Sequence, residues 1–206
     1  MTAATRKGRA TDEALKEAAR VVFARDGYLN AKISDIAAEA GRSAASFYNY
    51  YDTKADLLIA LAEEFHAEAT SLAVLPFRAG LARPDALREA VAGFWRTYAK
   101  RRGELIGIFQ AAMVEGRFRD RWLELRGEAV RRIAGEVRAA QAQGYCPGVD
   151  PVMTASALSA MLEHFCYVWL GAGGEKDVPF DDERALDAVA TIWVKAVFWR
   201  PEDGCA

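Results

Sequence analysis

Apolar residues recur at helical spacing along nearly the whole chain, and no stretch alternates between apolar and polar residues as a half-buried strand would. Leu15, Ala18 and Val22 share one helical face near the start, and Leu186 and Val189 share another near the end. Glycines and prolines interrupt this pattern often enough to predict about nine helices. The sequence therefore predicts an all-α protein.

A helix-turn-helix is predicted over residues 32–51. Two short helical stretches there are joined by a turn that contains Gly41, and two such short helices bury little surface by themselves. A longer helix, from Thr11 to Asp26, must complete their core. Proteins of this kind place the second short helix in the major groove of DNA. We thus expect a DNA-binding domain over residues 9–69 and a larger helical domain over residues 70–206.

The second short helix has a face suited to base edges. Its inward face is expected to carry Ala44, Phe47, Tyr48 and Tyr51, with only the hydroxyl of Tyr48 reaching the surface. Its outward face then carries Ala45, Ser46, Asn49 and Tyr50. Asparagine can pair bidentately with adenine, and alanine methyl groups can pack on thymine methyl groups. Lys54, just beyond this helix, is predicted to meet a backbone phosphate, and a solvated lysine is the alternative.

A family resemblance rests on Ala18-Ala19, Phe23, Gly27, Asp35-Ile36-Ala37, Ala40-Gly41, Ser43, Phe47-Tyr48, Tyr50-Tyr51, Lys54 and Leu57-Leu58. In this spacing, residues 9–69 strongly resemble the tetracycline-repressor (TetR) family of transcriptional regulators. The resemblance implies base or sugar contacts from Ala44, Ala45, Ser46 and Asn49. It implies phosphate contacts from Lys32, Ser43, Tyr48, Tyr50 and Lys54, to which Arg42 is expected to add one. Ala45 and Tyr51 depart from the commonest family pattern, which leaves the operator sequence open.

The second half of the chain is rich in aromatic and methionine side chains. Mostly apolar pockets with a few polar anchors hold small organic molecules, and methionine lets such a pocket adapt. The candidate ligand-binding residues are Phe94, Trp95, Tyr98, Phe109, Gln110, Met113, Trp122, Met161, His164 and Phe165. Ordinary core packing must account for most of them, and a core histidine is the alternative for His164.

Surplus apolar surface on the last two helices, at about residues 151–170 and 182–199, indicates a partner. The TetR resemblance implies that these helices pair into a homodimer interface. It also implies a repressor that binds double-stranded, palindromic operator DNA and is released by a small apolar or amphipathic effector. A DNA-binding structural or interaction protein that senses no small molecule remains the alternative.

Other classes of protein find little support. The chain has no nucleophile elbow, P-loop, dinucleotide fingerprint or HExxH motif, so we expect no enzyme and no cofactor. Three widely spaced cysteines, Cys146, Cys166 and Cys205, fit reduced thiols better than a metal site. No apolar run reaches the roughly 20 residues of a membrane span, and the polar start is unlike a signal peptide. We therefore expect a cytoplasmic protein, associated with the nucleoid when bound to DNA.

Charge is only slightly asymmetric. Residues 1–54 carry a net charge of +2 and the rest −4, which permits DNA binding without demanding it. Arg6, Lys7 and Arg9 are expected to form a disordered, solubilising tail, and an arm that enters the minor groove is the alternative.

Overall fold

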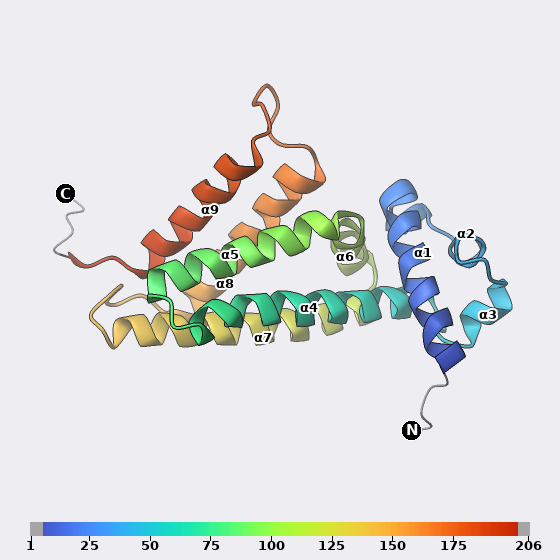
Figure 1. The fold of residues 1–206 in the computed structure, drawn as a ribbon, viewed down its shortest axis with the longest axis horizontal. Coiled ribbons are helices and arrows are strands. Elements are labelled where there is room, and N and C mark those ends of the chain that lie inside the picture. The colour runs from blue at the N-terminus through green and yellow to red at the C-terminus, as the bar shows by residue number, and fades with distance from the viewer. Residues whose placement is uncertain (1–5, 202–206) are drawn as a thin grey trace. The chain divides into compact units, whose positions relative to one another are not determined.

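A computed structural model describes residues 6–201, and every regular element in that range is helical (Figure 1). Nine α-helices and one π-helical turn follow one another along these residues. The all-α prediction is therefore confirmed. Cys205 lies outside the described residues, as do the side chains of Arg6 and Lys7. No described helix is both long enough and apolar enough to cross a membrane.

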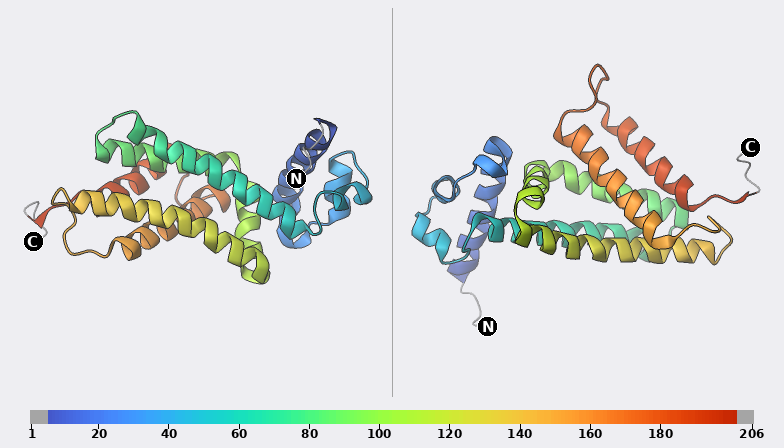
Figure 2. Two further views of the ribbon diagram at one scale, coloured as in Figure 1. Left: turned by 90° about the horizontal axis from the view of Figure 1, so that it is seen from below. Right: turned by 180° about the vertical axis from the view of Figure 1, so that it is seen from behind.

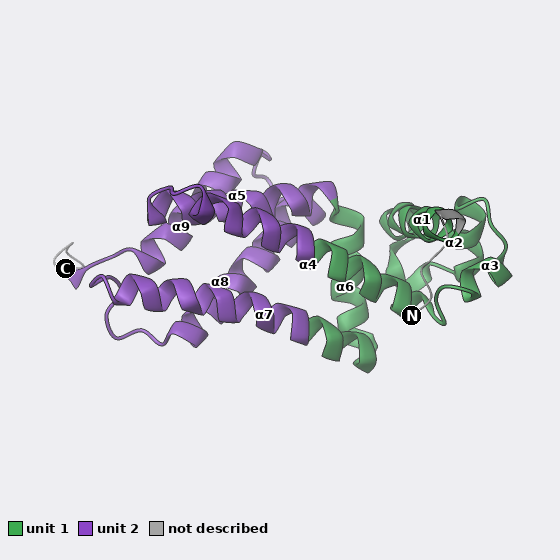
Figure 3. Ribbon diagram, turned by 60° about the horizontal axis from the view of Figure 1, so that its bottom comes forward, with its two compact units in different colours: residues 1–65, 101–123 green, residues 66–100, 124–206 purple. Residues whose placement is uncertain are grey.

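The chain divides into two compact units (Figure 3). Unit 1 combines the first 65 residues with residues 101–123, and unit 2 contains the remainder. The helices of unit 1 are α1 (Arg6–Asn30), α2 (Ile33–Glu39), α3 (Ala44–Tyr48), the first part of α4 (Lys54–Arg78), α6 (Arg102–Val114) and the first part of α7 (Gly116–Gln141). The three-helix arrangement at the N-terminus thus includes a later segment, α6, within the same compact unit.

Small residues let α6 approach α1 closely. Gly103, Gly107 and Ala111 are spaced four residues apart, so they lie on one face of α6. A Cβ atom added at Gly103 would lie 2.4 Å from the Cβ atom of Ala24, and one at Gly107 would lie 3.5 Å from the Cβ atom of Tyr28. A side chain at Gly103 would therefore hold the helices apart, whereas a Cβ atom at Gly107 would be in ordinary van der Waals contact.

The buried face of α6 differs from the predicted one. The sequence pattern indicated a stripe of Leu105, Phe109, Ala112 and Met113, whereas the structure buries Glu104, Leu105, Gly107, Ile108 and Ala111. Met113 is 80% exposed. Only Leu105 of the four predicted residues is fully buried, because this helix packs through its smallest residues and not through its large apolar side chains.

Two helix boundaries also differ from what the sequence signals indicate. α1 begins at Arg6 rather than Thr11, and Thr11 is buried within the helix instead of capping it. The backbone at residues 6–10 is therefore helical, which contradicts the expected disordered tail. α4 continues to Arg78 although proline usually ends a helix, because Pro76 lies only one turn from its end and interrupts little of the helix.

Unit 2 is built from α5 (Arg83–Lys100), α8 (Pro151–Cys166), the π-helical turn η1 (Tyr167–Gly171), α9 (Asp182–Val197) and the remaining parts of α4 and α7. α5 and α9 pack side by side (Figure 2). The indole N–H of Trp95 donates a 2.8 Å hydrogen bond to Asp182, and Arg88 donates one of 3.0 Å to Thr191. These contacts hold α9 along α5. Cys146 and Cys166 are buried, free thiols.

Candidate nucleic-acid interface

The turn between α2 and α3 has the geometry of a helix-turn-helix. Gly41 adopts a φ of 63°, in the left-handed region that favours glycine. Ser43 then caps α3, because its hydroxyl accepts a 3.2 Å hydrogen bond from the backbone N–H of Ser46. Phe47 is completely buried and anchors α3 against the rest of unit 1. These local features fix a short helix with one anchored side chain.

The surface of α3 is more open than the sequence indicated. Ala44 and Tyr48, both expected on the inward face, are exposed, and Tyr48 is 56% exposed. α3 spans only five residues, so Phe47 alone fills the space beneath it. Tyr51, which was also expected on the inward face, does turn inward, and its hydroxyl donates a 2.5 Å hydrogen bond to Asp12 of α1.

Most of the predicted DNA-contact residues lie together around α3. The exposed members of this set, named here the α3 surface, are Arg42, Ser43, Ala44, Ala45, Tyr48, Asn49 and Tyr50, and Ser46 is half-buried among them. Lys32 is exposed just before α2. The α3 surface presents hydroxyl, amide and methyl groups, which are the groups that can read base edges in the major groove.

Lys54 contacts the end of α1 and not the residues of the α3 surface. Its ammonium donates hydrogen bonds to the carbonyl oxygens of Tyr28, Leu29 and Ala31, at 2.7, 3.2 and 3.1 Å. The same nitrogen lies 4.5 Å from the centre of the Tyr28 ring. Burial lowers the pKa of Lys54, while the carboxylate of Glu115 acts in the opposite direction. The ammonium therefore caps the carbonyl end of α1.

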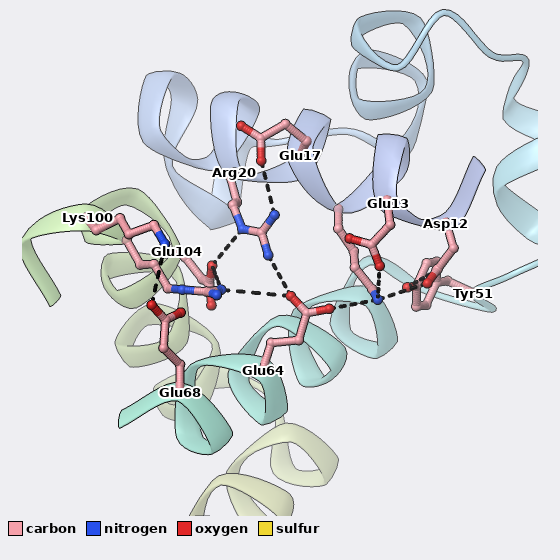
Figure 4. A network of polar contacts seen from close by, with 11 residues as sticks. Asp12, Glu13, Glu17, Arg20, Tyr51, Glu64, Glu68, Lys100 and Glu104 are labelled. Atoms are coloured by element: carbon pink, nitrogen blue, oxygen red, sulfur yellow. Dashed lines mark hydrogen bonds and ion pairs between the residues drawn. The ribbon is translucent and has the colours of Figure 1, made fainter. Parts of the chain in front are cut away.

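Charged side chains join α1, α4 and α6 (Figure 4). Arg20 donates to Glu104 at 3.1 Å and to Glu64 at 2.6 Å, and Lys16 lies 2.8 Å from Glu64. Arg101 adds a contact of 3.4 Å to Glu104. This set of Lys16, Arg20, Glu64, Arg101 and Glu104 is named here the charged cluster.

Glu104 is the most buried member of the charged cluster, with a side chain that is 0% exposed. Burial raises the pKa of its carboxyl group, and Arg101 and Arg20 offset part of that rise. One carboxylate oxygen, Oε1, is buried without a hydrogen-bond partner in the described part of the chain. Sequence reasoning missed this cluster, since acidic and basic residues at helical spacing look like an exposed face.

The ten predicted ligand-binding residues divide between the two units. Phe109, Gln110, Met113 and Trp122 belong to unit 1, and Phe94, Trp95, Tyr98, Met161, His164 and Phe165 belong to unit 2. Within unit 1, Gln110 accepts a 3.0 Å hydrogen bond from the backbone N–H of Tyr28. Met113 faces outward. These two unit 1 candidates thus contact the N-terminal helix or solvent.

In unit 2 the candidate residues of α5 and α8 come together. The ring centres of Trp95 and Phe165 are 6.0 Å apart, and those of Phe94 and Tyr98 are 6.4 Å apart. Tyr98 is 1% exposed, and its hydroxyl has no hydrogen-bond partner among the described residues. Burial raises the pKa of Tyr98. His164 is exposed on α8, beside Tyr167, so it is no core histidine.

Two family models match different parts of this chain. Residues 15–61 match the family described as bacterial regulatory proteins of the tetR family. Residues 87–199 match the C-terminal domain of the transcriptional regulator EthR, and this match alone covers more than half of the chain. The HTH-type transcriptional repressor NicS of Pseudomonas putida is 31% identical over 141 residues, which is 66% of this chain and 65% of that protein.

Solved structures share the fold at lower identity. A regulatory protein of the tetR family from Rhodococcus has a TM-score of 0.75 at 20% identity, covering 91% of this chain and 97% of its own. AibR, solved in complex with isovaleryl coenzyme A and operator DNA, has a TM-score of 0.70 at 20% identity, covering 91% of this chain and 100% of its own. The predictions of a helix-turn-helix and of a regulator rather than an enzyme are confirmed by the family match. The chain belongs to the TetR family of transcriptional regulators.

Proposed function

We propose that this protein is a repressor that binds an inverted-repeat operator as a homodimer and leaves it when a small apolar or amphipathic molecule binds. The α3 surface carries the proposal, because its amide, hydroxyl and methyl groups are exposed around a helix that Phe47 anchors. The contacts proposed for DNA come from Lys32, Arg42, Ser43, Ala44, Ala45, Ser46, Tyr48, Asn49 and Tyr50. The relative NicS, which is described as a repressor, supports the direction of regulation.

Selection from a pool of random double-stranded DNA tests this role. The unmodified protein should enrich an inverted repeat whose half-sites lie about 34 Å, one helical turn, or somewhat more apart. Enrichment of a single half-site, or of no sequence, would count against the proposal. The selected sequence also supplies the operator DNA for measurements on variants.

A stripe of exposed residues along α8 and into the start of η1 supports the homodimer. Met153, Ala157, Ala160, His164 and Tyr167 are spaced alternately four and three residues apart and are all exposed. This spacing is that of a seam between two packed helices. None of these residues except His164 can carry a positive charge, and none is acidic. On α9, Ile192 is 51% exposed, whereas Trp193 is buried within the protomer.

A charge placed in the α8 stripe should separate the subunits. Ala160→Glu lies at its centre, and Ala99→Glu makes the same change at an exposed position of α5. Sedimentation velocity at micromolar concentration should show monomers for Ala160→Glu and dimers for Ala99→Glu and the unmodified chain. Monomers of the unmodified chain would refute the homodimer, and an Ala160→Glu dimer would place its interface elsewhere.

The effector is proposed to lie among Phe94, Trp95, Tyr98 and Phe165 of unit 2. Aromatic rings supply apolar contacts there, and the hydroxyl of Tyr98, which has no partner among the described residues, can serve as the polar anchor. AibR offers a parallel, since its structure holds an acyl coenzyme A together with operator DNA. The site proposed for this chain is argued from its own aromatic side chains and the hydroxyl of Tyr98, not from AibR.

Native mass spectrometry of the purified protein tests for such a molecule. A bound compound of apolar or amphipathic character should weaken operator binding, and by linkage the operator must weaken compound binding by the same factor. A compound that binds equally well with and without operator is no effector. Loss of binding in Tyr98→Phe would support the anchor, and unchanged binding would exclude it.

A further inference from the structure

Tyr28 lies at a kink in α1, and its N–H, carbonyl and hydroxyl groups all form hydrogen bonds. Gly27 adopts φ 73° and ψ 156°, so the helix is interrupted directly before Tyr28. The backbone N–H of Tyr28 donates a 3.0 Å hydrogen bond to Oε1 of Gln110, and its carbonyl accepts one of 2.7 Å from Lys54. Its hydroxyl donates to the carboxylate of Glu115. Residues of α4 and α6, and Glu115 directly after α6, therefore take all the polar groups of Tyr28.

Lys54 uses its full hydrogen-bonding capacity in this arrangement. An ammonium group has three N–H donors, and Lys54 has three carbonyl acceptors at the end of α1. The last carbonyls of a helix lack partners within the helix, and a nearby cation satisfies them. A phosphate contact would require the ammonium to give up at least one of these bonds.

Gln110 fits the same kink from α6. A Cβ atom added at Gly27 would lie 3.5 Å from Oε1 of Gln110 and 3.7 Å from its Nε2, so the amide packs against the glycine. Gln110 accepts a hydrogen bond from the backbone N–H of Tyr28. The kink at Gly27 takes this N–H out of the regular hydrogen-bonding pattern of the helix. A buried donor left without a partner is costly, which gives this single amide a specific role.

The position of α2 depends on this region. Only Ala31 and Lys32 separate α1 from α2, and Lys54 binds the carbonyl of Ala31. Whatever fixes the end of α1 therefore also fixes where the helix-turn-helix begins. A binding surface must be held within about 0.5 Å of its productive geometry to read bases well.

We infer that Lys54 and Gln110 are positioning residues for operator recognition, which hold the end of α1 at Tyr28 and thereby orient α2 and α3. Lys54 acts through the carbonyls at the end of α1 and leaves the DNA phosphates to other side chains. Gln110 contributes from α6, outside the helix-turn-helix. This inference rests on the proposed binding of operator DNA.

The salt dependence of operator binding separates positioning from phosphate contact. Removal of one phosphate contact should flatten the slope of log K against log[salt] by about 0.9. Lys54→Met keeps the alkyl chain, and we expect it to weaken binding about tenfold because it removes charge-assisted hydrogen bonds. Its slope should equal that of the unmodified protein. A flattened slope, or unchanged affinity, would overturn the role assigned to Lys54.

Lys54→Arg provides a second measurement should Lys54→Met fold poorly. Arginine keeps the charge and binds phosphate well, but its planar guanidinium does not match three carbonyls arranged around a compact ammonium. Positioning therefore predicts weakened binding for Lys54→Arg, and a phosphate contact predicts near-normal binding. Circular dichroism establishes the folded fraction of each variant.

Gln110 is tested with variants on α6. Gln110→Leu removes the acceptor and should weaken operator binding, whereas Gln110→Glu keeps it and should bind close to normally. Met113→Leu changes an exposed residue of the same helix and is the matched control. Because Lys54 and Gln110 both act through Tyr28, the combined loss in the double variant should be smaller than the product of the single losses.

Two results would overturn the role of Gln110: normal operator binding by folded Gln110→Leu, or losses that multiply independently in the double variant. Failure of the unmodified protein to bind its selected DNA is a different result. It would overturn the proposed function itself, and the positioning roles with it.

Discussion

The α3 surface and the contact between α1 and α6 lie in the same unit, but the polar groups of the first are exposed and those of the second bind one another. On the α3 surface, hydroxyl and amide groups are exposed, and few of them form hydrogen bonds with other described residues. Where α1 meets α6 and α4, charged and amide groups are bound to one another through the charged cluster and Tyr28. Residue type alone does not distinguish these two regions, since each contains a basic residue and a side-chain amide.

Because of this difference, residues of the same chemical type have different roles in the two regions. Asn49 and Gln110 both carry an amide, but Asn49 is exposed beside α3 and Gln110 binds the backbone of Tyr28. Lys32 and Lys54 both carry an ammonium, but Lys32 is exposed, whereas Lys54 binds three carbonyls at the end of α1. We therefore expect substitutions in the first region to change DNA recognition and substitutions in the second to change stability or positioning.

The largest effect is expected from Gly103→Ala. The added Cβ atom would lie 2.4 Å from the Cβ atom of Ala24, with backbone atoms of the same residue close behind, so α1 and α6 must separate. Overpacking typically costs about 1–3 kcal/mol and occasionally more, and a clash with backbone atoms should lie at the upper end of that range, above the roughly 1 kcal/mol that alanine gains over glycine in a helix. Urea denaturation followed by circular dichroism should show the loss of stability.

Gly135→Ala is the matched control for this prediction. Gly135 lies within α7, and a Cβ atom there would meet nothing within 4 Å. The same substitution should then stabilise the protein by about 0.5–1 kcal/mol, through helix propensity alone. Stabilisation by both variants would mean that α1 and α6 are not held together by the close approach at Gly103.

Asn49→Ala should leave stability unchanged and alter base preference. Asn49 is exposed and contributes no packing to the core, so its loss should appear only in DNA recognition. The cost is expected to be about 1–3 kcal/mol, confined to one position of each half-site. Fluorescence anisotropy with single-base variants of the selected operator measures it.

Lys32→Ala provides the contrast, at an exposed lysine just before α2. Removing the phosphate contact proposed for Lys32 should weaken binding to all sequences alike and flatten the salt slope by about 0.9 for each subunit. A change of base preference in Lys32→Ala, with none in Asn49→Ala, would show that the face turned toward the bases has been assigned wrongly.

Much of the fold followed from the sequence because local signals agreed with one another. Thr53 and Asp56 are a capping-box pair by residue type and spacing, and each accepts a hydrogen bond from the backbone N–H of the other. Asp150 followed by Pro151 is a helix-start signal by residue type, and Asp150 caps α8 by accepting a 2.7 Å hydrogen bond from the backbone N–H of Met153. Such signals need only neighbouring residues, so they can be recognised without knowing which helices meet.

Contacts between distant residues were harder to predict. The carbonyls that Lys54 binds lie 23 to 26 residues earlier in the chain, and Gln110 lies 82 residues from Tyr28. Apolar periodicity indicates that a helix is buried but not which partner it meets. The spacing of Gly103, Gly107 and Ala111 was the signal that could have revealed the buried face of α6, because only small residues permit so close an approach.

The smallest expected effect comes from Glu104→Gln, and it tests whether the charged cluster stabilises the contact between α1 and α6. Burial raises the pKa of Glu104 despite Arg101 and Arg20, so the ionised form is less favourable in the folded protein than in the unfolded chain. The stability associated with the protonated carboxyl is present at low pH and disappears as pH rises through the folded-state pKa. Glutamine keeps the shape of the protonated form without the charge.

We therefore expect Glu104→Gln to be more stable than the unmodified protein at neutral pH, by less than the loss in Gly103→Ala. The advantage should shrink as pH falls through the range in which the carboxyl takes up its proton. Urea denaturation at several pH values measures both quantities. Destabilisation at neutral pH would mean that the bonds from Arg20 and Arg101 outweigh the burial of the carboxylate. The charged cluster would then hold α1 to α6 through its ion pairs, and not through the small residues alone.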